Sequence, residues 1–190
     1  MSSDIKRILN ELRQDHKNMT VLLNMIEREA NHIYEGGDSD FEVIQDVMHY
    51  MTVYPDAVHH PKEDRLYAEL KAVRPDLAAG FDRITRDHRN ISESGRRLRD
   101  DLNLAGAGSF IRRKTLVGDA LRYVNELRNH MQWEELDLFR RCDKMAADGH
   151  VIIIDSHLIS NGDPVFEKQD HTEFKRLLEN IEQSLTASHA

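Results

Sequence analysis

Residues 54–67 read Tyr54-Pro-Asp-Ala-Val-His59-His60-Pro-Lys-Glu63-Asp64-Arg-Leu-Tyr67, and the fold prediction rests on the His-x-x-x-Glu spacing inside this stretch. On an α-helix, residues four positions apart lie one turn apart on the same face. The imidazole of His59 and the carboxylate of Glu63 therefore point into the same space, which is the geometry of metal ligands. The same spacing returns later in the chain at His130 and Glu134.

The surroundings of the two motifs decide how they are interpreted. One His-x-x-x-Glu pair alone is more often a solvated helix face with a weak ion pair. Here each pair follows an Asp-His-x-Asn segment, which contains His16 in the first half and His88 in the second. Each histidine or glutamate of the first copy lies 71 or 72 residues before its counterpart. This internal repeat favours one metal site. Its predicted ligands are His16, His59, Glu63, His88, His130 and Glu134.

Composition limits the class of protein. The 190 residues suit one domain, with 39% hydrophobic and 32% charged residues, 4 Pro and 9 Gly, which is typical of a folded, mainly helical chain. The net charge of −8 and the lack of a basic stripe argue against nucleic acid as a partner. No apolar run reaches the roughly 20 residues that span a bilayer, and no signal-peptide core begins the chain. With one cysteine, Cys142, expected as a packed thiol, these features predict a cytoplasmic protein without membrane contact.

Apolar residues at three-and-four spacing predict helices over residues 3–34, 40–73, 75–104 and 110–147. Short links predict antiparallel neighbours, so the expected fold is all-α, an up-down-up-down four-helix bundle with an additional C-terminal helix. Residues 1–148 are expected to form the metal-binding bundle. Residues 149–190 are expected to add a connector and a C-terminal packing helix to the same domain.

Local signals refine these helices. Pro55 and Pro61 each remove a helical hydrogen bond, which predicts a kink or bulge where His59 projects. The alternative is one helix that ends near residue 54 and a second that starts near residue 56. Ser109 is expected to cap the helix over residues 110–147. Asp163 is expected to cap the last helix, which extends to about residue 185.

Two further segments are less defined by their patterns. Glycines at 36 and 37 end the first helix, and residues 38–39 are expected to cap the next. For residues 151–159, periodicity does not decide between strand and helix. The last helix is expected to act as a lid or a dimer contact, with His171 structural or exposed.

Several polar residues flank the predicted ligands. Asp15 and Asp87 each precede the first histidine of a copy and point about 100° away from it on a helix, so each either orients a ligand or faces solvent. His60 is expected off the axis of the site, unless the distorted helix brings it closer. Tyr54 and Tyr123 lie upstream of the second histidines and either hydrogen-bond a ligand or pack.

Four imidazoles and two carboxylates suit Fe, Mn or Zn better than Ca or Mg. If both glutamates bridge, two ions can bind, each with about two histidines and two bridging oxygens. An oxo or hydroxo bridge and one open position complete the coordination, and the open position can accept dioxygen, peroxide or nitric oxide. Because ligation needs neutral imidazole and ionised carboxylate, metal affinity is expected to fall below about pH 6.

Over residues 3–147 this pattern resembles the hemerythrin-like proteins with an HHE cation-binding domain, and His59-His60-Pro-Lys-Glu63-Asp64 is close to the bacterial form. The resemblance implies that the six predicted ligands hold two non-haem iron ions, with the glutamates bridging. Two positions depart from the oxygen carriers. Ser92 stands where they have a second histidine after the third-helix ligand, and their fourth-helix carboxylate aligns with Glu135. One iron is then more open, which favours a sensor, a redox enzyme or an iron-handling protein over reversible oxygen carriage.

The leading prediction is a non-haem di-iron protein that binds or reacts with dioxygen, peroxide or nitric oxide, in oxygen or redox sensing or the stress response. If it is an enzyme, it is a di-iron oxidoreductase. The alternative is a structural, regulatory or iron-handling metal protein without turnover. A third reading is a metal-free helical interaction protein whose last helix recruits a partner. For the leading prediction, the expected partner is the small diatomic or peroxide ligand. A homodimer is a further expectation.

Overall fold

The computed structural model describes residues 3–37, 41–149, 162–170 and 172–187 of the chain. The described residues form helices and no strand, which confirms the all-α prediction. The elements are α1 (Ser3–Tyr34), α2 (Phe41–Tyr54), the π-helical η1 (Pro55–His59), α3 (His60–Val73), the 3₁₀ turn η2 (Pro75–Leu77), α4 (Phe81–Gly106), α5 (Arg113–Trp133), the π-helical η3 (Glu134–Leu138), α6 (Phe139–Ala147) and α7 (Lys175–Ala187). None of the described helices is long and apolar enough to cross a bilayer.

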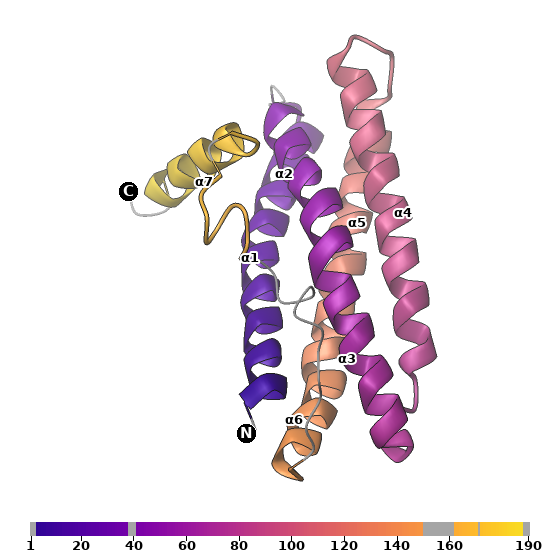
Figure 1. Cartoon of the computed structure of the whole chain (residues 1–190). Coiled ribbons are helices and arrows are strands. Elements are labelled where there is room, and N and C mark those ends of the chain that lie inside the picture. Colours follow the sequence, from indigo (N-terminus) through magenta and orange to yellow (C-terminus); the bar gives the residue numbers. More distant parts are fainter. Residues whose placement is uncertain (1–2, 38–40, 150–161, 171, 188–190) are drawn as a thin grey trace.

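Four rods form the bundle (Figure 1): α1, the continuous run α2-η1-α3, α4, and the continuous run α5-η3-α6. α1 packs against α2 and α5, and α4 packs against the same two helices, so each rod has two neighbours around a shared core. This arrangement confirms the predicted bundle with its additional C-terminal helix, since α7 packs on the outside against α2. The division of the chain at residue 148 stays a prediction.

A polar layer divides the core of the bundle. One apolar cluster includes Met19 and Leu127, and the other includes Leu12 and Leu138. His16 lies between Leu12 and Met19 on α1, so the layer of histidines and glutamates is covered by apolar side chains on both sides. Burial of these side chains removes apolar surface from water, which stabilises the bundle and excludes bulk water from the layer.

The predicted bulge around the first motif is present. The His60 N–H bonds to the Pro55 oxygen, five residues back, as in a π-helix. Tyr54 keeps helical dihedral angles (φ −68°, ψ −51°), so the alternative of two separate helices is wrong. Unexpectedly, the second motif has a π-segment too, because the Phe139 N–H bonds to the Glu134 oxygen. No proline predicted this second bulge.

Two predicted helix starts are wrong. The third helix begins at Phe81 rather than at residue 75, because Gly80 has a left-handed backbone (φ 90°) that interrupts helical hydrogen bonding. The fourth begins at Arg113, with the extended Arg112 before it, so Ser109 does not cap it. Instead the Ser109 N–H bonds to the Leu104 oxygen at 2.9 Å and closes the end of α4.

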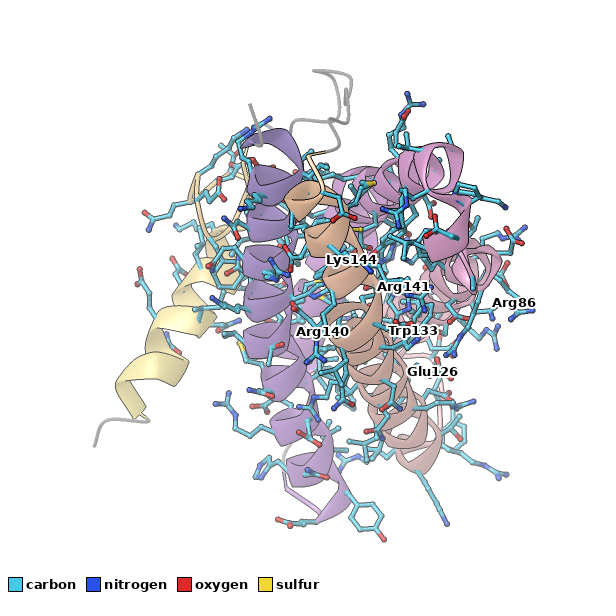
Figure 2. All side chains as sticks on the ribbon, turned by 90° about the horizontal axis from the view of Figure 1, so that it is seen from below. Arg86, Glu126, Trp133, Arg140, Arg141 and Lys144 are labelled. Carbon is cyan, nitrogen blue, oxygen red and sulfur yellow. The ribbon has the colours of Figure 1, made fainter. Side chains whose placement is uncertain are left out.

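The turn before α4 is held against the neighbouring rod α5-η3-α6. Arg141 of α6 donates to the carbonyl oxygens of Leu77 and Ala79 at 3.0 and 2.6 Å. Figure 2 labels Arg141, and its guanidinium lies 5.9 Å from the centre of the Phe81 ring at the start of α4. Because this turn leads directly into α4, these bonds help to fix the position of α4 in the bundle, and with it the height of His88.

The last helix also begins later than predicted, at Lys175. Asp163 caps a turn instead: its Oδ1 accepts from the N–H groups of Val165 and Phe166 at 2.9 and 3.0 Å. Its Oδ2 accepts from Asn18 at 3.0 Å and from Tyr50 at 2.7 Å, which ties the segment to α1 and α2.

The packing face predicted for the last helix consists of Phe166, Phe174, Leu177, Leu178 and Ile181. Leu177, Leu178 and Ile181 of α7 and Phe174 just before it are buried, whereas Phe166 is partly buried and lies outside the helix. The expectations for residues 38–39, residues 151–159 and His171 lie outside the described residues. The role of α7 as a lid or dimer contact stays a prediction.

Candidate metal centre

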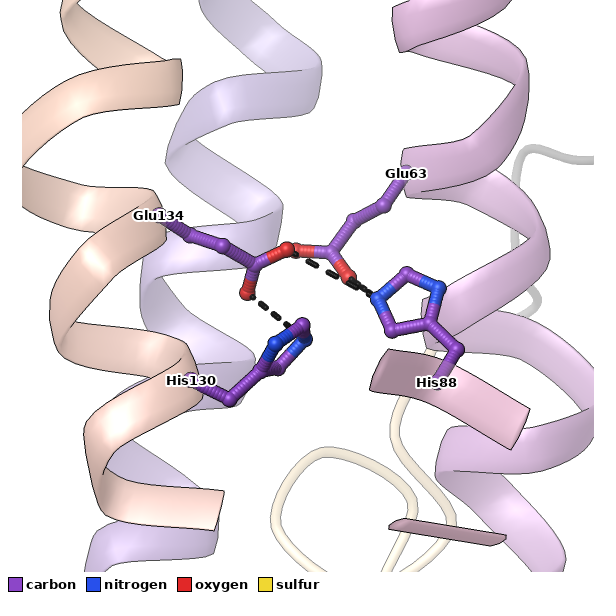
Figure 3. Close-up of side chains that lie close together, drawn as sticks. All are labelled: Glu63, His88, His130 and Glu134. Atoms are coloured by element: carbon purple, nitrogen blue, oxygen red, sulfur yellow. Dashed lines mark ion pairs between the residues drawn. The ribbon is translucent and has the colours of Figure 1, made fainter. Parts of the chain in front are cut away.

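All six residues singled out by the repeat meet in the polar layer. Each is at most 5% exposed, although they come from four different rods. The donor atoms of Glu63, His88, His130 and Glu134 lie within 4.8 Å of one another, and those of His16, His59 and Glu63 form a second such group. Figure 3 shows the first group, in which the two carboxylates meet between the facing rods.

Glu63 stands between the two groups. Its Oε1 lies 3.4 Å from His59 Nε2 and 3.6 Å from His16 Nε2, whereas its Oε2 lies 3.3 Å from His88 Nε2. The two oxygens of one carboxylate thus face different histidines, as a bridging ligand requires. Nitrogen and oxygen donors bind iron-group metals at about 2.0–2.2 Å, so donors of one ion stand about 3–4.3 Å apart. The observed spacings fall in that range.

Glu134 has the same relation to the histidines. Its Oε2 lies 3.4 Å from His130 Nε2 and 3.5 Å from His16 Nε2, and its Oε1 lies 3.7 Å from His88 Nε2. The carboxylate therefore reaches histidines on both sides of the layer. Together with Glu63 it offers two bridges between two positions for an ion.

The layer has unsatisfied polar atoms. Among the described residues, the buried side-chain nitrogens and oxygens without a hydrogen-bond partner all belong to this layer. They are His16 Nε2, His60 Nε2, both Glu63 oxygens, His88 Nε2, both His130 nitrogens and Glu134 Oε2. A buried polar atom without a partner costs about 1–3 kcal/mol. A bound cation would satisfy these atoms, so the donor set fits a metal.

Carboxylates orient three of the histidines from outside. The Nδ1 of His59 lies 3.0 Å from Asp15, which settles the open question about Asp15 in favour of an orienting role. Tyr54 in turn donates to Asp15 at 3.2 Å. Such bonds keep the proton on Nδ1 and leave the Nε2 lone pair for a metal. Asp87, by contrast, pairs with Arg83 on the surface at 2.8 Å.

The other orienting residues were not predicted. The His16 Nδ1 lies 3.1 Å from Glu135, and the His88 Nδ1 lies 3.2 Å from Asp64. Tyr67 reaches Glu134 Oε1 at 3.5 Å. The available signal was spacing. Asp64 directly follows the predicted ligand Glu63, and Tyr67 lies one turn after Glu63 on the same helix face.

Electrostatics of the metal-free layer favour protonated imidazoles. Burial lowers the pKa of His88, but contacts with Asp64, Glu134 and Glu63 outweigh it and raise this pKa to about 12. The pKa of His16 is also raised well above its ordinary value, because Glu134, Glu135 and Glu63 outweigh burial. Burial raises the pKa of Glu63, yet the nearby His59, His16 and His88 lower it well below its usual range. At His130 burial dominates and lowers the pKa.

Metal binding is therefore expected to release protons at pH 7, because an ion needs the unprotonated nitrogens of His16 and His88. Apparent affinity should rise about tenfold per pH unit for each proton released, and this rise should continue above pH 7. Calorimetric titration with metal in two buffers of different ionisation enthalpy measures the proton count. Equal heats in both buffers would contradict the prediction.

The histidines should give the metal-free protein a free energy of unfolding that falls as pH rises, whereas its metal affinity rises with pH. Raised histidine pKa values stabilise the fold fully below the ordinary value of 6.5, and this contribution is lost as pH rises toward the folded value. The lowered pKa of Glu63 stabilises it above 4.5, and that contribution is lost as pH falls.

A groove leads from solvent toward one side of the layer. It lies between α4 and α5, has a volume of about 550 Å³, and has His130 and Tyr123 in its lining. Tyr123 packs against Gly95, where an added Cβ would stand 3.0 Å from the tyrosine ring. The groove thus brings solvent up to His130, the one residue of the layer in its lining.

Comparison with known proteins agrees with this geometry. The sequence model of the family described as "Hemerythrin HHE cation binding domain" matches residues 7–142, a span that contains all six residues of the layer. No curated protein and no solved structure matches the chain.

Proposed function

The chain belongs to the hemerythrin HHE cation-binding domain family, and from this premise we propose that it is a non-haem di-iron protein that binds or reacts with dioxygen, peroxide or nitric oxide. The proposed ligands are His16, His59, Glu63, His88, His130 and Glu134. The cytoplasmic location and a homodimer stay predictions from the sequence.

The unpartnered donor atoms of the buried layer carry this proposal. Two groups of donors share Glu63, so the layer offers two positions for ions joined by a carboxylate. Two histidines and two bridging carboxylates leave an octahedral ion with unfilled positions. A pair of ferrous ions would supply the electrons that reduce an oxidising small molecule.

The residues around the layer have definable tasks. Asp15, Asp64 and Glu135 hold three imidazoles with Nε2 toward the centre. Burial and the nearby Glu134 raise the pKa of Tyr67 well above its ordinary value, so its hydroxyl stays a proton donor. The groove at His130, with a volume of about 550 Å³, is wide enough to admit dioxygen, nitric oxide or peroxide.

The second candidate is a metal site without turnover, with a structural, regulatory or iron-handling role. The position of the layer between two apolar clusters favours it, because ions there would join four rods at the middle of the core. Reaction of the iron-loaded protein with oxygen, peroxide or nitric oxide is expected for the first candidate and not for the second.

Anaerobic loading with ferrous iron, followed by metal analysis and optical spectroscopy, tests the proposal. We expect two irons per chain and visible charge-transfer absorption after addition of oxygen, peroxide or nitric oxide. Iron-loaded protein that stays colourless and consumes neither oxygen nor peroxide would leave the second candidate. Protein that binds no iron would overturn both.

A further inference from the structure

His60 is drawn into the polar layer although it directly follows a proposed ligand. Neighbouring residues on a regular α-helix point about 100° apart. Yet His59 is 1% exposed and His60 is 6% exposed, so both imidazoles are buried. The π-segment η1 accounts for this, because its wider turn ends at the His60 N–H.

The His60 ring lies among the imidazoles of the layer. It stacks on the His88 ring with centroids 4.3 Å apart and 17° between the planes. The His130 ring meets it edge-on at 6.4 Å, and the His59 ring lies at 5.7 Å. His60 therefore lies against His88, and His130 is the further of the other two rings.

The two ring nitrogens of His60 have different surroundings. Nδ1 faces the Asp56 carboxylate at 3.4 Å, whereas Nε2 is buried and has no partner. A buried histidine with only a packing role usually has both nitrogens satisfied. The arrangement instead matches His16 and His88, whose Nδ1 faces a carboxylate and whose Nε2 is also unpartnered.

Asp56 is itself held in place. It accepts from the Ser92 hydroxyl of α4, and Arg96 Nε lies 3.7 Å away. The carboxylate is thus fixed by groups outside the layer, as an orienting residue must be. His60 then keeps the tautomer that leaves Nε2 with its lone pair free.

We propose that His60 is a fifth histidine of the metal centre, whose Nε2 is available to the ion held by His88 and His130. The inference rests on the proposed metal-binding function. His60 Nε2 is outside the two groups of donors that lie within 4.8 Å of one another. An ion bound at Nε2 lies in the plane of the imidazole, and the His60 and His88 planes are nearly parallel, so coordination requires the His60 ring to turn out of this stack and move toward the ion on loading. An added imidazole would favour iron, cobalt or zinc over magnesium.

Replacement of His60→Asn tests the proposal, because the amide N–H can replace Nδ1–H against Asp56 while Nε2 is lost. Parent and variant are titrated anaerobically with Co²⁺, and bound ions, dissociation constants and ligand-field absorption are measured. We expect the variant to bind one of two ions at least about tenfold more weakly, with an altered spectrum. The metal-free variant should be as stable as the parent, because an unpartnered buried nitrogen has been removed.

His49→Asn is the matched control, since His49 also lies on the second rod and faces a carboxylate, Glu173, at 2.9 Å on the surface. Its Co²⁺ binding should equal that of the parent. Unchanged affinity and spectrum in His60→Asn would overturn the His60 assignment, whether or not its stability falls. If His60→Asn does not fold, His60→Ala, which also lacks the Nε2 donor, is measured in its place against the same affinity and spectral criteria. A parent that binds no Co²⁺ would instead overturn the proposed function.

Discussion

Replacement of Glu63→Gln is expected to abolish tight binding of both metal ions, the largest effect of any single substitution. Glu63 is 0% exposed and is the one residue shared by both groups of donors among the described residues. An amide has no charge and one fewer acceptor oxygen, so the bridge through residue 63 cannot form. The loss should exceed the roughly 10–100-fold cost of removing a group that only orients a ligand. Metal analysis after anaerobic loading and desalting measures it.

Glu69→Gln is the matched control, because Glu69 lies on the same helix and pairs with Arg65 near the surface at 2.6 Å. This variant should retain the parent's metal content. Circular dichroism checks that Glu63→Gln is still helical. A helical Glu63→Gln protein that retains both ions would contradict the bridging role.

Metal loading is expected to raise the midpoint of thermal unfolding by about 8–16 °C for each ion bound. A ligand present at about 1,000 times its Kd stabilises the native state by about 4 kcal/mol. In a chain of this size about 1 kcal/mol shifts the midpoint by about 2–4 °C. The gain is large because the ions would replace the unsatisfied contacts of buried donors at the centre of four rods.

The measurement compares melting curves of anaerobic protein with iron and with excess chelator. The Glu63→Gln variant serves as the control, and its midpoint should be the same in both conditions. Identical curves for loaded and metal-free parent would show that the ions do not contribute to stability.

The bundle and the convergence of six residues were predictable because both follow from local rules. Apolar spacing of three and four defines a helix face, and His-x-x-x-Glu places two side chains on it. The repeat then indicated which histidines belonged together. These rules apply within one helix and need no knowledge of its neighbours. The role of the six residues as ligands stays a prediction.

What the sequence did not predict depends on contacts between rods. Asp64 orients His88 of α4, and Glu135 orients His16 of α1, although each carboxylate lies far from its histidine in the chain. Spacing within one segment carries no information on such partners. The wrong start of the third helix has a local cause, the left-handed backbone of Gly80, which the residue type permits without requiring it.

The π-segments bear on how related chains should be aligned. Each wider turn contains one residue more than a regular helix needs, and η1 ends at His59 whereas η3 begins at Glu134. Deletion of a single codon there would restore an ordinary helix and rotate the two parts of that rod by about 100° relative to each other. A homologue with a one-residue gap at η1, which precedes His59 and Glu63 on the same rod, can therefore keep every histidine and glutamate and still have lost the centre.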